Sequence, residues 1–181
     1  MCSARSGGGV DVADRNDFEE FVAARSAALL RTAYLLTGQH ADAEDLLQRA
    51  FLKVVPAWSR IQGSPEAYVR KVMVRENISR WRARRWREVL VSRHPEEPTD
   101  SGTSLEDRLT LMAALATLAP RQRAVIVLRY FEDLTEVETA RLLGVAVGTV
   151  KSQHRDAIAR LRVLVPDLLR EGSDERRTVA P

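Results

Sequence analysis

Residues 135–162 combine a glycine-centred turn with a helical pattern that carries cationic and hydrogen-bonding side chains. A helix-turn-helix needs a small residue where its helices cross, a glycine for a left-handed turn, and apolar residues that fix the second helix to the first. Such residues stand at the required offsets: Ala140, Gly144, Val145 and Val150. Gly148 and Thr149 allow the first turn of the second helix close to a sugar-phosphate backbone, and the side chains that follow are of the types that contact phosphates and base edges: Lys151, Ser152, Gln153 and Arg155. The pattern predicts a DNA-reading unit, and the alternative is a helical hairpin in an ordinary bundle.

A second cluster that could bind a polyanion lies in residues 69–89. Its basic side chains are opposed only by Glu76 and Glu88, and they are Arg70, Lys71, Arg75, Arg80, Arg82, Arg84, Arg85 and Arg87. Such a concentration is suited to neutralising phosphates, and binding of this kind depends strongly on salt. Trp81 and Trp86 offer flat faces to unstacked bases, and Asn77 can make paired hydrogen bonds to a base edge. Packing in the core is the alternative for Trp81.

Helices are expected to position both clusters, because apolar residues recur at helical spacing and no strand-like alternation stands out. The first helix of the chain is predicted to end at Thr37 and Gly38. The second should bend or end at Pro56, and the third should begin with Ser64 as cap and Pro65 as first helical residue. We therefore expect an all-α fold.

The helical periodicity stops over residues 92–103, where proline, acidic and small polar residues gather. We interpret this stretch as a flexible linker. Helices resume at residue 104, and Thr135 and Glu138 have the spacing of a capping box in front of the predicted helix-turn-helix. The sequence thus predicts two small helical domains, residues 17–91 and 104–170, flanked by polar tails at residues 1–16 and 171–181.

Composition and charge exclude several classes of protein. The 181 residues carry 28 Lys and Arg against 25 Asp and Glu, a net charge of +3, so a polyanion must be bound by local clusters rather than by overall charge. The single cysteine, Cys2, excludes a disulfide framework within the chain. Since no apolar run approaches the roughly 20 residues that cross a bilayer, and the beginning of the chain lacks a secretory pattern, we expect a cytoplasmic protein.

Residues suited to catalysis or metal binding are scattered. The three histidines, His40, His94 and His154, lack a metal-ligand spacing, and the glycines at residues 7–9 are not followed by the lysine of a phosphate-binding loop. We expect neither a cofactor nor a metal site nor an enzymatic activity.

Three motifs together resemble the extracytoplasmic-function (ECF) group of bacterial RNA polymerase sigma factors of the sigma-70 family, particularly its actinobacterial members. They are TGQHADAEDLLQRAFLKVVPAW, residues 77–87, and LAPRQRAVIVLRYFEDLTEVETARLLGVAVGTVKS, and the similarity covers about residues 17–168. The resemblance implies that the first domain binds the clamp coiled coil of the largest polymerase subunit and reads the minus-10 promoter element. It implies that the second domain binds the flap of the second-largest subunit and reads the minus-35 element.

The resemblance also implies site residues. The polymerase-binding face falls on Asp42, Asp45, Leu46, Gln48 and Phe51, with core packing as the alternative for Leu46 and Phe51. The minus-10 segment contains Asn77, Arg80, Arg84 and Arg85, and we expect Trp81 and Trp86 of the same stretch to contact DNA as well. Residues 59–64 match a loop that captures a flipped base. The minus-35 helix contains Lys151, Ser152 and Arg155, and the flap contact falls on Val127, Leu128, Tyr130 and Phe131.

The match has departures in the predicted reading helix. Ala146 stands where a capping Ser or Pro is usual, which removes about 1 kcal/mol of capping. Gln153 replaces a frequent arginine, and Thr139 and His154 replace aliphatic residues; we expect His154 to pack, with a DNA contact as the alternative. The implied function is promoter-specific initiation with core polymerase, an anti-sigma protein is a candidate further partner, and a stand-alone helix-turn-helix regulator is the alternative.

Overall fold

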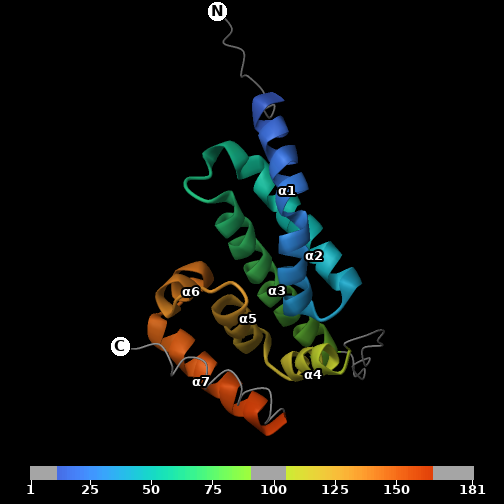
Figure 1. Cartoon of the computed structure of the whole chain (residues 1–181), viewed down its shortest axis with the longest axis vertical. Helices are drawn as coiled ribbons and strands as arrows, with labels where there is room; N and C mark the ends of the chain where they lie inside the picture. The colour runs from blue at the N-terminus through green and yellow to red at the C-terminus, as the bar shows by residue number, and fades with distance from the viewer. Residues whose placement is uncertain (1–11, 91–104, 165–181) are drawn as a thin grey trace, which may run out of the picture.

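A computed structural model describes residues 12–90 and 105–164, which form seven α-helices and one short 3-10 helix without any strand (Figure 1). The prediction of an all-α fold is confirmed. The predicted linker, residues 92–103, and most of the predicted tails lie outside the described residues.

The first half of the chain consists of α1 (Val12–Thr37), α2 (His40–Val54), the 3-10 helix η1 (Val55–Arg60) and α3 (Pro65–Leu90). Helix α1 begins at Val12, within the stretch of residues 1–16 that was predicted to be a polar tail. No glycine or proline separates Val12 from the rest of the helix. It ends as predicted: Gly38 has a φ of +92° and donates its backbone N–H to the Tyr34 carbonyl at 2.8 Å.

The other two predicted boundaries in this half are also confirmed. Helix α2 stops at Val54, and the chain tightens into η1 because Pro56 has no N–H to donate to the preceding turn. The Ser64 hydroxyl accepts a hydrogen bond from the Ala67 N–H at 3.3 Å, and α3 starts with Pro65.

The second half consists of α4 (Leu105–Ala116), α5 (Pro120–Tyr130), α6 (Glu136–Leu143) and α7 (Val147–Leu164). The capping box before α6 is formed: the Thr135 hydroxyl accepts from the Glu138 N–H at 3.2 Å, and the Glu138 carboxylate accepts from the Thr135 N–H at 2.7 Å. The hydrogen bonds from Thr135 lower the pKa of Glu138 below its usual value. The first turn of the helix-turn-helix is therefore held in place by hydrogen bonds between two residues that are close in the sequence.

Thr135→Ala is expected to lower the free energy of unfolding by about 1 kcal/mol, because it leaves the first turn of α6 without its cap. Urea unfolding of the purified protein would measure the change. Ser79→Ala removes an exposed hydroxyl from the interior of α3 and serves as the matched control, with an expected change within about 0.5 kcal/mol. Equal losses in the two variants would show that the cap contributes nothing specific.

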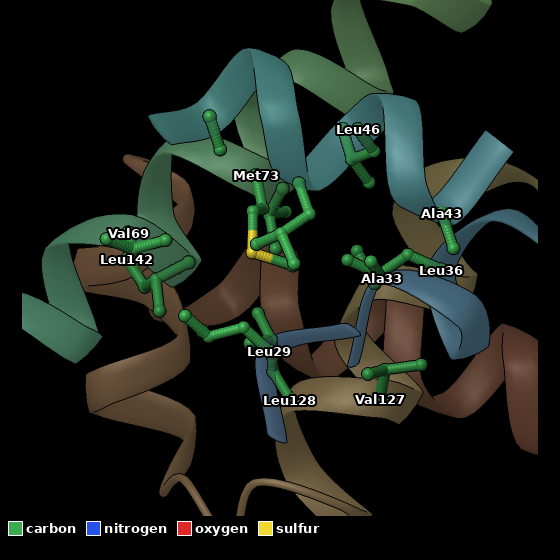
Figure 2. Close-up of a cluster of buried hydrophobic side chains, with 14 of the residues drawn as sticks. Leu29, Ala33, Leu36, Ala43, Leu46, Val69, Met73, Val127, Leu128 and Leu142 are labelled. Atoms are coloured by element: carbon green, nitrogen blue, oxygen red, sulfur yellow. The ribbon is translucent and has the colours of Figure 1, made fainter. Parts of the chain in front are cut away.

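The two halves share one hydrophobic core (Figure 2). Buried residues of α1, α2 and α3, including Leu29, Leu46 and Met73, are in one cluster with residues from the second half. Those residues are Ala124, Val127 and Leu128 of α5 and Leu142 of α6. The sequence predicted two helical domains, and in the structure this cluster of buried residues joins them. Periodicity shows that a face is buried but does not show which helix covers it.

Two smaller clusters lie within the second half. One joins Leu115, Leu118 and Ile126 to Leu161 of α7, and the other joins Val125 to Ala140 and Val150 under the turn. In Figure 1, α5 lies beside α3, and α7 lies on the far side of α5 from α1. Among the described helices, none is both long and apolar enough to cross a membrane.

Candidate nucleic-acid and polymerase interfaces

The helix-turn-helix predicted from the sequence is present in α6 and α7. Gly144 has a φ of +68° and closes α6, and the Val145 N–H donates to the Ala140 carbonyl at 3.0 Å. Ala140 and Val150 are buried together against Val125 of α5. The small residue at the helix crossing and the apolar residue of the second helix therefore pack as their spacing predicted. The turn thereby fixes α7 relative to the rest of the second half.

The N-terminal half of α7 presents cationic side chains to solvent. Lys151 and Arg155 have side-chain exposures of 66% and 79%. Their ion pairs are loose, with Lys151 Nζ at 3.8 Å from a Glu136 oxygen and Arg155 Nε at 3.5 Å from an Asp156 oxygen. Exposed pairs of this kind contribute little, so both cations can exchange their partners for phosphates. A Cβ at Gly148 would meet no atom within 4 Å, which leaves room for close approach to this turn.

Two other polar residues of α7 are engaged within the protein. The Ser152 hydroxyl donates to the Thr149 carbonyl at 3.0 Å. His154 is half-buried: its Nε2 lies 2.9 Å from the Tyr130 hydroxyl, and the two rings stack with centroids 5.7 Å apart. Burial, aided by the charge of Arg129, lowers the pKa of His154. The packing expected of His154 is what the structure shows.

The other departures from the family pattern are also visible. The Ala146 carbonyl accepts the N–H groups of Thr149 and Val150 at 2.9 and 3.3 Å, but its side chain has no oxygen to cap α7. Thr139 is fully buried, and its hydroxyl has no hydrogen-bond partner among the described residues. An aliphatic residue at 139 would avoid that cost.

Helix α3 directs only part of its predicted minus-10 residues outward. Trp81 is 37% exposed, whereas Asn77 is half-buried and donates its side-chain amide to the Leu36 carbonyl at 3.3 Å. The backbone at Arg84, Arg85 and Trp86 is helical, but their side chains lie outside the described part of the chain. The predicted groups of this helix are therefore not one uniformly exposed face.

Arg80 connects the predicted minus-10 helix to the predicted polymerase-binding helix. Its guanidinium lies 3.4 Å from an Asp42 oxygen and 2.9 Å from an Asp45 oxygen, and its side chain is 21% exposed. A hydrogen bond from Arg49, with the charge of Arg80 adding to it, lowers the pKa of Asp45. Three residues assigned to two separate surfaces thus form one ion-pair cluster.

The polymerase-binding residues predicted on α2 divide by burial. Leu46 is 0% exposed in the shared core, and Phe51 is half-buried with its ring edge-on to Phe18, centroids 5.8 Å apart. Gln48 is exposed, and Leu52, which the sequence interpretation missed, is 73% exposed. A signal was available, because Leu52 lies one helical turn after Gln48 on the face opposite the apolar stripe.

The predicted flap-binding residues divide in the same way. Val127 and Leu128 are 0% exposed and lie in the core shared with the first half, while Tyr130 and Phe131 are each 44% exposed. Of the predicted base-capturing loop, residues 59–64, the first two belong to η1 and residues 61–64 follow it. Gly63 adopts a φ of +86° with open space around it.

A cavity of about 240 Å³ brings the two predicted DNA-reading helices together. Arg75, Ser79 and Arg82 of α3 line one side, and Arg121, Thr149 and Gln153 of the second half line the other. None of the three arginines forms an ion pair with a carboxylate of the described residues. The rest of the lining is apolar and consists of Ile78, Val125, Leu143, Val145 and Val150, so the space between the predicted minus-10 and minus-35 readers combines three arginines with an apolar wall.

Comparisons with known proteins identify the two halves of the chain. Residues 21–87 match the family model "Sigma-70 region 2", and residues 114–163 match "Sigma-70, region 4". The chain is 44% identical over 149 residues to an RNA polymerase sigma-E factor of Streptomyces coelicolor, covering 81% of this chain and 84% of that protein. It is 34% identical over 154 residues to the ECF RNA polymerase sigma factor SigL of Mycobacterium tuberculosis, covering 79% and 85%.

Solved structures share the fold. The sigma factor RpoE in complex with the anti-sigma factor NepR from Bartonella quintana matches with a TM-score of 0.70 at 24% identity, covering 84% of this chain and 98% of that one. CnrH, in complex with the cytosolic domain of CnrY, matches with a TM-score of 0.60 at 21% identity, covering 84% and 89%. The two family models and the extensive identity to named relatives place this chain in the sigma-70 family, as an ECF RNA polymerase sigma factor.

Proposed function

We propose how this sigma factor, which directs transcription initiation, divides the work among its surfaces. The exposed part of α2 around Gln48 binds core RNA polymerase, α3 reads the minus-10 element, and α7 reads the minus-35 element. The observation that supports this best is the helix-turn-helix itself, which presents Lys151 and Arg155 on the solvent side of α7. A helix so presented can enter the major groove with its N-terminal turns.

Promoter choice then follows from two readers on one chain. Cationic contacts to phosphates set the register, and each good base contact adds about 1–3 kcal/mol of discrimination. Because both readers are on the same polypeptide, binding of one raises the effective concentration of the other at its element. Capture of unstacked bases by α3 and the loop at residues 61–64 supplies binding energy for melting, so the proposal needs neither a cofactor nor a catalytic residue in this chain.

The proposal includes a place and a second partner. The protein acts in the cytoplasm, where its polymerase and promoter are. An anti-sigma protein is a partner as well, and the solved complex of the related fold with an anti-sigma factor supports this.

A gel-shift assay with and without core polymerase separates this function from that of a stand-alone regulator. A sigma factor is expected to form a promoter-specific complex only when core polymerase is present. Tight, sequence-specific binding of the isolated protein to duplex DNA, unaffected by polymerase, would instead identify a helix-turn-helix repressor or activator.

Lys151→Ala and Arg155→Ala are each expected to weaken promoter binding by the holoenzyme and to reduce its salt slope by about 1, because each removes one phosphate contact. Binding isotherms at several salt concentrations would measure the slope. Arg160→Ala is the matched control, since Arg160 is also exposed on α7 but lies further from its N-terminus. An equal loss of slope in the control would mean that α7 does not enter the groove by its first turns.

A further inference from the structure

The cavity between α3 and the helix-turn-helix, about 240 Å³ in volume, combines an apolar interior with a cationic rim. Val125 of α5 and Val150 of α7 are 1% and 0% exposed, so they line its interior. Arg75 and Arg82 of α3 and Arg121 of α5 are exposed, so they line its mouth. Ligand sites in proteins commonly have this composition, with apolar walls that take the body of a ligand and a few polar groups that orient it.

One face of α3 forms a wall of this cavity. The residues of α3 that line it recur at the spacing that brings side chains to the same side of a helix, and they are Arg75, Ile78, Ser79 and Arg82. The two arginines are therefore about 10 Å apart along the helix axis, since each residue adds about 1.5 Å. Arginine side chains have several rotatable bonds, so both guanidinium groups can turn toward an anion held between them.

The three arginines at the mouth lack counterions within the part of the chain that the structure describes. Arg75, Arg82 and Arg121 neither donate a hydrogen bond to another described residue nor pair with one. No Asp or Glu is among the described residues that line the cavity. By contrast, Arg49, an exposed arginine of α2, pairs with Asp45 at 2.9 Å. Like charges around one space repel each other, so an anion held there is attracted by all three.

Arg75 shows how closely the charge and the apolar wall are joined. A Cβ added to Gly144 would lie 3.1 Å from Arg75 Nη2, so the guanidinium extends from α3 to the turn between α6 and α7. Leu143 and Val145, on either side of that glycine, also line the cavity. A cation therefore lies at the edge of the apolar wall, and one small ligand can contact both.

These features define the chemical class of the ligand. A guanidinium binds a phosphate through two parallel hydrogen bonds. A phosphate monoester carries a charge of about −1.5 to −2 at pH 7, which matches three arginines better than a single carboxylate does. The apolar walls favour an organic phosphate over the inorganic ion. The volume of about 240 Å³ is below the roughly 300–1,000 Å³ of sites for drug-sized ligands, so the ligand is smaller than those.

We propose that this cavity is a binding site for a small organic phosphate with an apolar body. Arg75, Arg82 and Arg121 bind the phosphate at the mouth, and the body packs against Val125 and Val150 inside. Because the ligand contacts both halves of the folded chain, its binding also raises the free energy of unfolding. The site does not depend on the proposed function, since it needs neither promoter DNA nor polymerase.

Isothermal titration calorimetry of the purified chain with matched probes tests the site. Naphthyl phosphate carries both a phosphate and an apolar body, whereas inorganic phosphate and naphthol each carry one of the two. We expect naphthyl phosphate to bind about tenfold more tightly than either, because only it engages the arginines and the apolar wall together. Naphthoate, with a single negative charge, should bind more weakly than naphthyl phosphate. Failure of naphthyl phosphate to bind, or equal binding of any other probe, would overturn the assignment.

Variants locate the binding in this cavity. Arg121→Gln, which removes one cation of the mouth, is expected to weaken the binding of naphthyl phosphate about tenfold. Ser79→Leu narrows the cavity without changing its charge and should weaken binding as well. Arg160→Gln is the matched control, because it removes an exposed arginine of α7 that does not line the cavity, and it should bind like wild type.

Wild-type affinity in either cavity variant, or the same loss in the control, would contradict the site. Arg82→Gln takes the place of Arg121→Gln if circular dichroism shows that the latter does not fold. All titrations are done without DNA and polymerase. Their failure therefore leaves promoter recognition intact, and a failure of promoter recognition leaves the ligand site intact.

Discussion

Leu46→Ala is expected to lower the free energy of unfolding by about 2–5 kcal/mol, because Leu46 is fully buried in the core shared by the two halves. The resemblance to sigma factors places this residue on the polymerase-binding face, but a buried side chain cannot contact a partner in this conformation. Folded Leu46→Ala protein should therefore bind core polymerase with nearly wild-type affinity. Urea unfolding and a polymerase pull-down at low temperature would measure the two quantities.

Leu52→Ala provides the matched control, since it makes the same substitution further along α2 at a side chain that is 73% exposed. Its unfolding free energy should stay within about 0.5 kcal/mol of wild type, while its affinity for polymerase should fall. The reverse pattern, a stable Leu46→Ala that loses polymerase and a Leu52→Ala that keeps it, would show that the core is rearranged in the complex.

Replacing both Arg84 and Arg85 by alanine is expected to reduce open-complex formation by at least tenfold and to lower the salt slope of promoter binding by about 2. Both residues lie on the C-terminal part of α3, the helix that carries the concentrated positive charge. Binding of core polymerase should be unchanged, because neither residue is on α2. Permanganate footprinting of melted bases and a polymerase pull-down would provide the two measurements.

Arg15 and Arg31, two exposed arginines of α1, form the corresponding control pair when both are replaced by alanine. That variant loses the same net charge but should keep promoter opening. Equal losses of opening and of polymerase binding in Arg84→Ala/Arg85→Ala would remove the basis for assigning promoter recognition to this part of α3.

Local features of the fold could be predicted from the sequence because they depend on neighbours in the chain. The cap at Ser64, the break at Pro56, the capping box of Thr135 and Glu138 and the left-handed turn at Gly144 all follow from backbone chemistry within a few residues. The helix-turn-helix could be predicted for the same reason.

Contacts between distant segments could not be predicted in this way. In the sequence, Arg123 is one of several basic residues that follow Pro120. The residues next to it in the chain do not show that its guanidinium contacts the C-terminal end of α1. The sequence predicted that Arg80 contacts DNA, whereas in the structure its guanidinium forms ion pairs with Asp42 and Asp45. Both arginines fit the same pattern of basic residues on a helix. Only the packing of α5 against α1, and of α3 against α2, shows which partner each arginine has.

Run-off transcription with purified core polymerase tests the central claim most directly. On promoter fragments from the organism that carries this chain, core polymerase with this protein is expected to give discrete transcripts that disappear when either the minus-35 or the minus-10 element is scrambled. Core polymerase alone should give none of them. If no fragment yields a promoter-specific product, or if core polymerase alone yields the same products, the chain does not direct initiation.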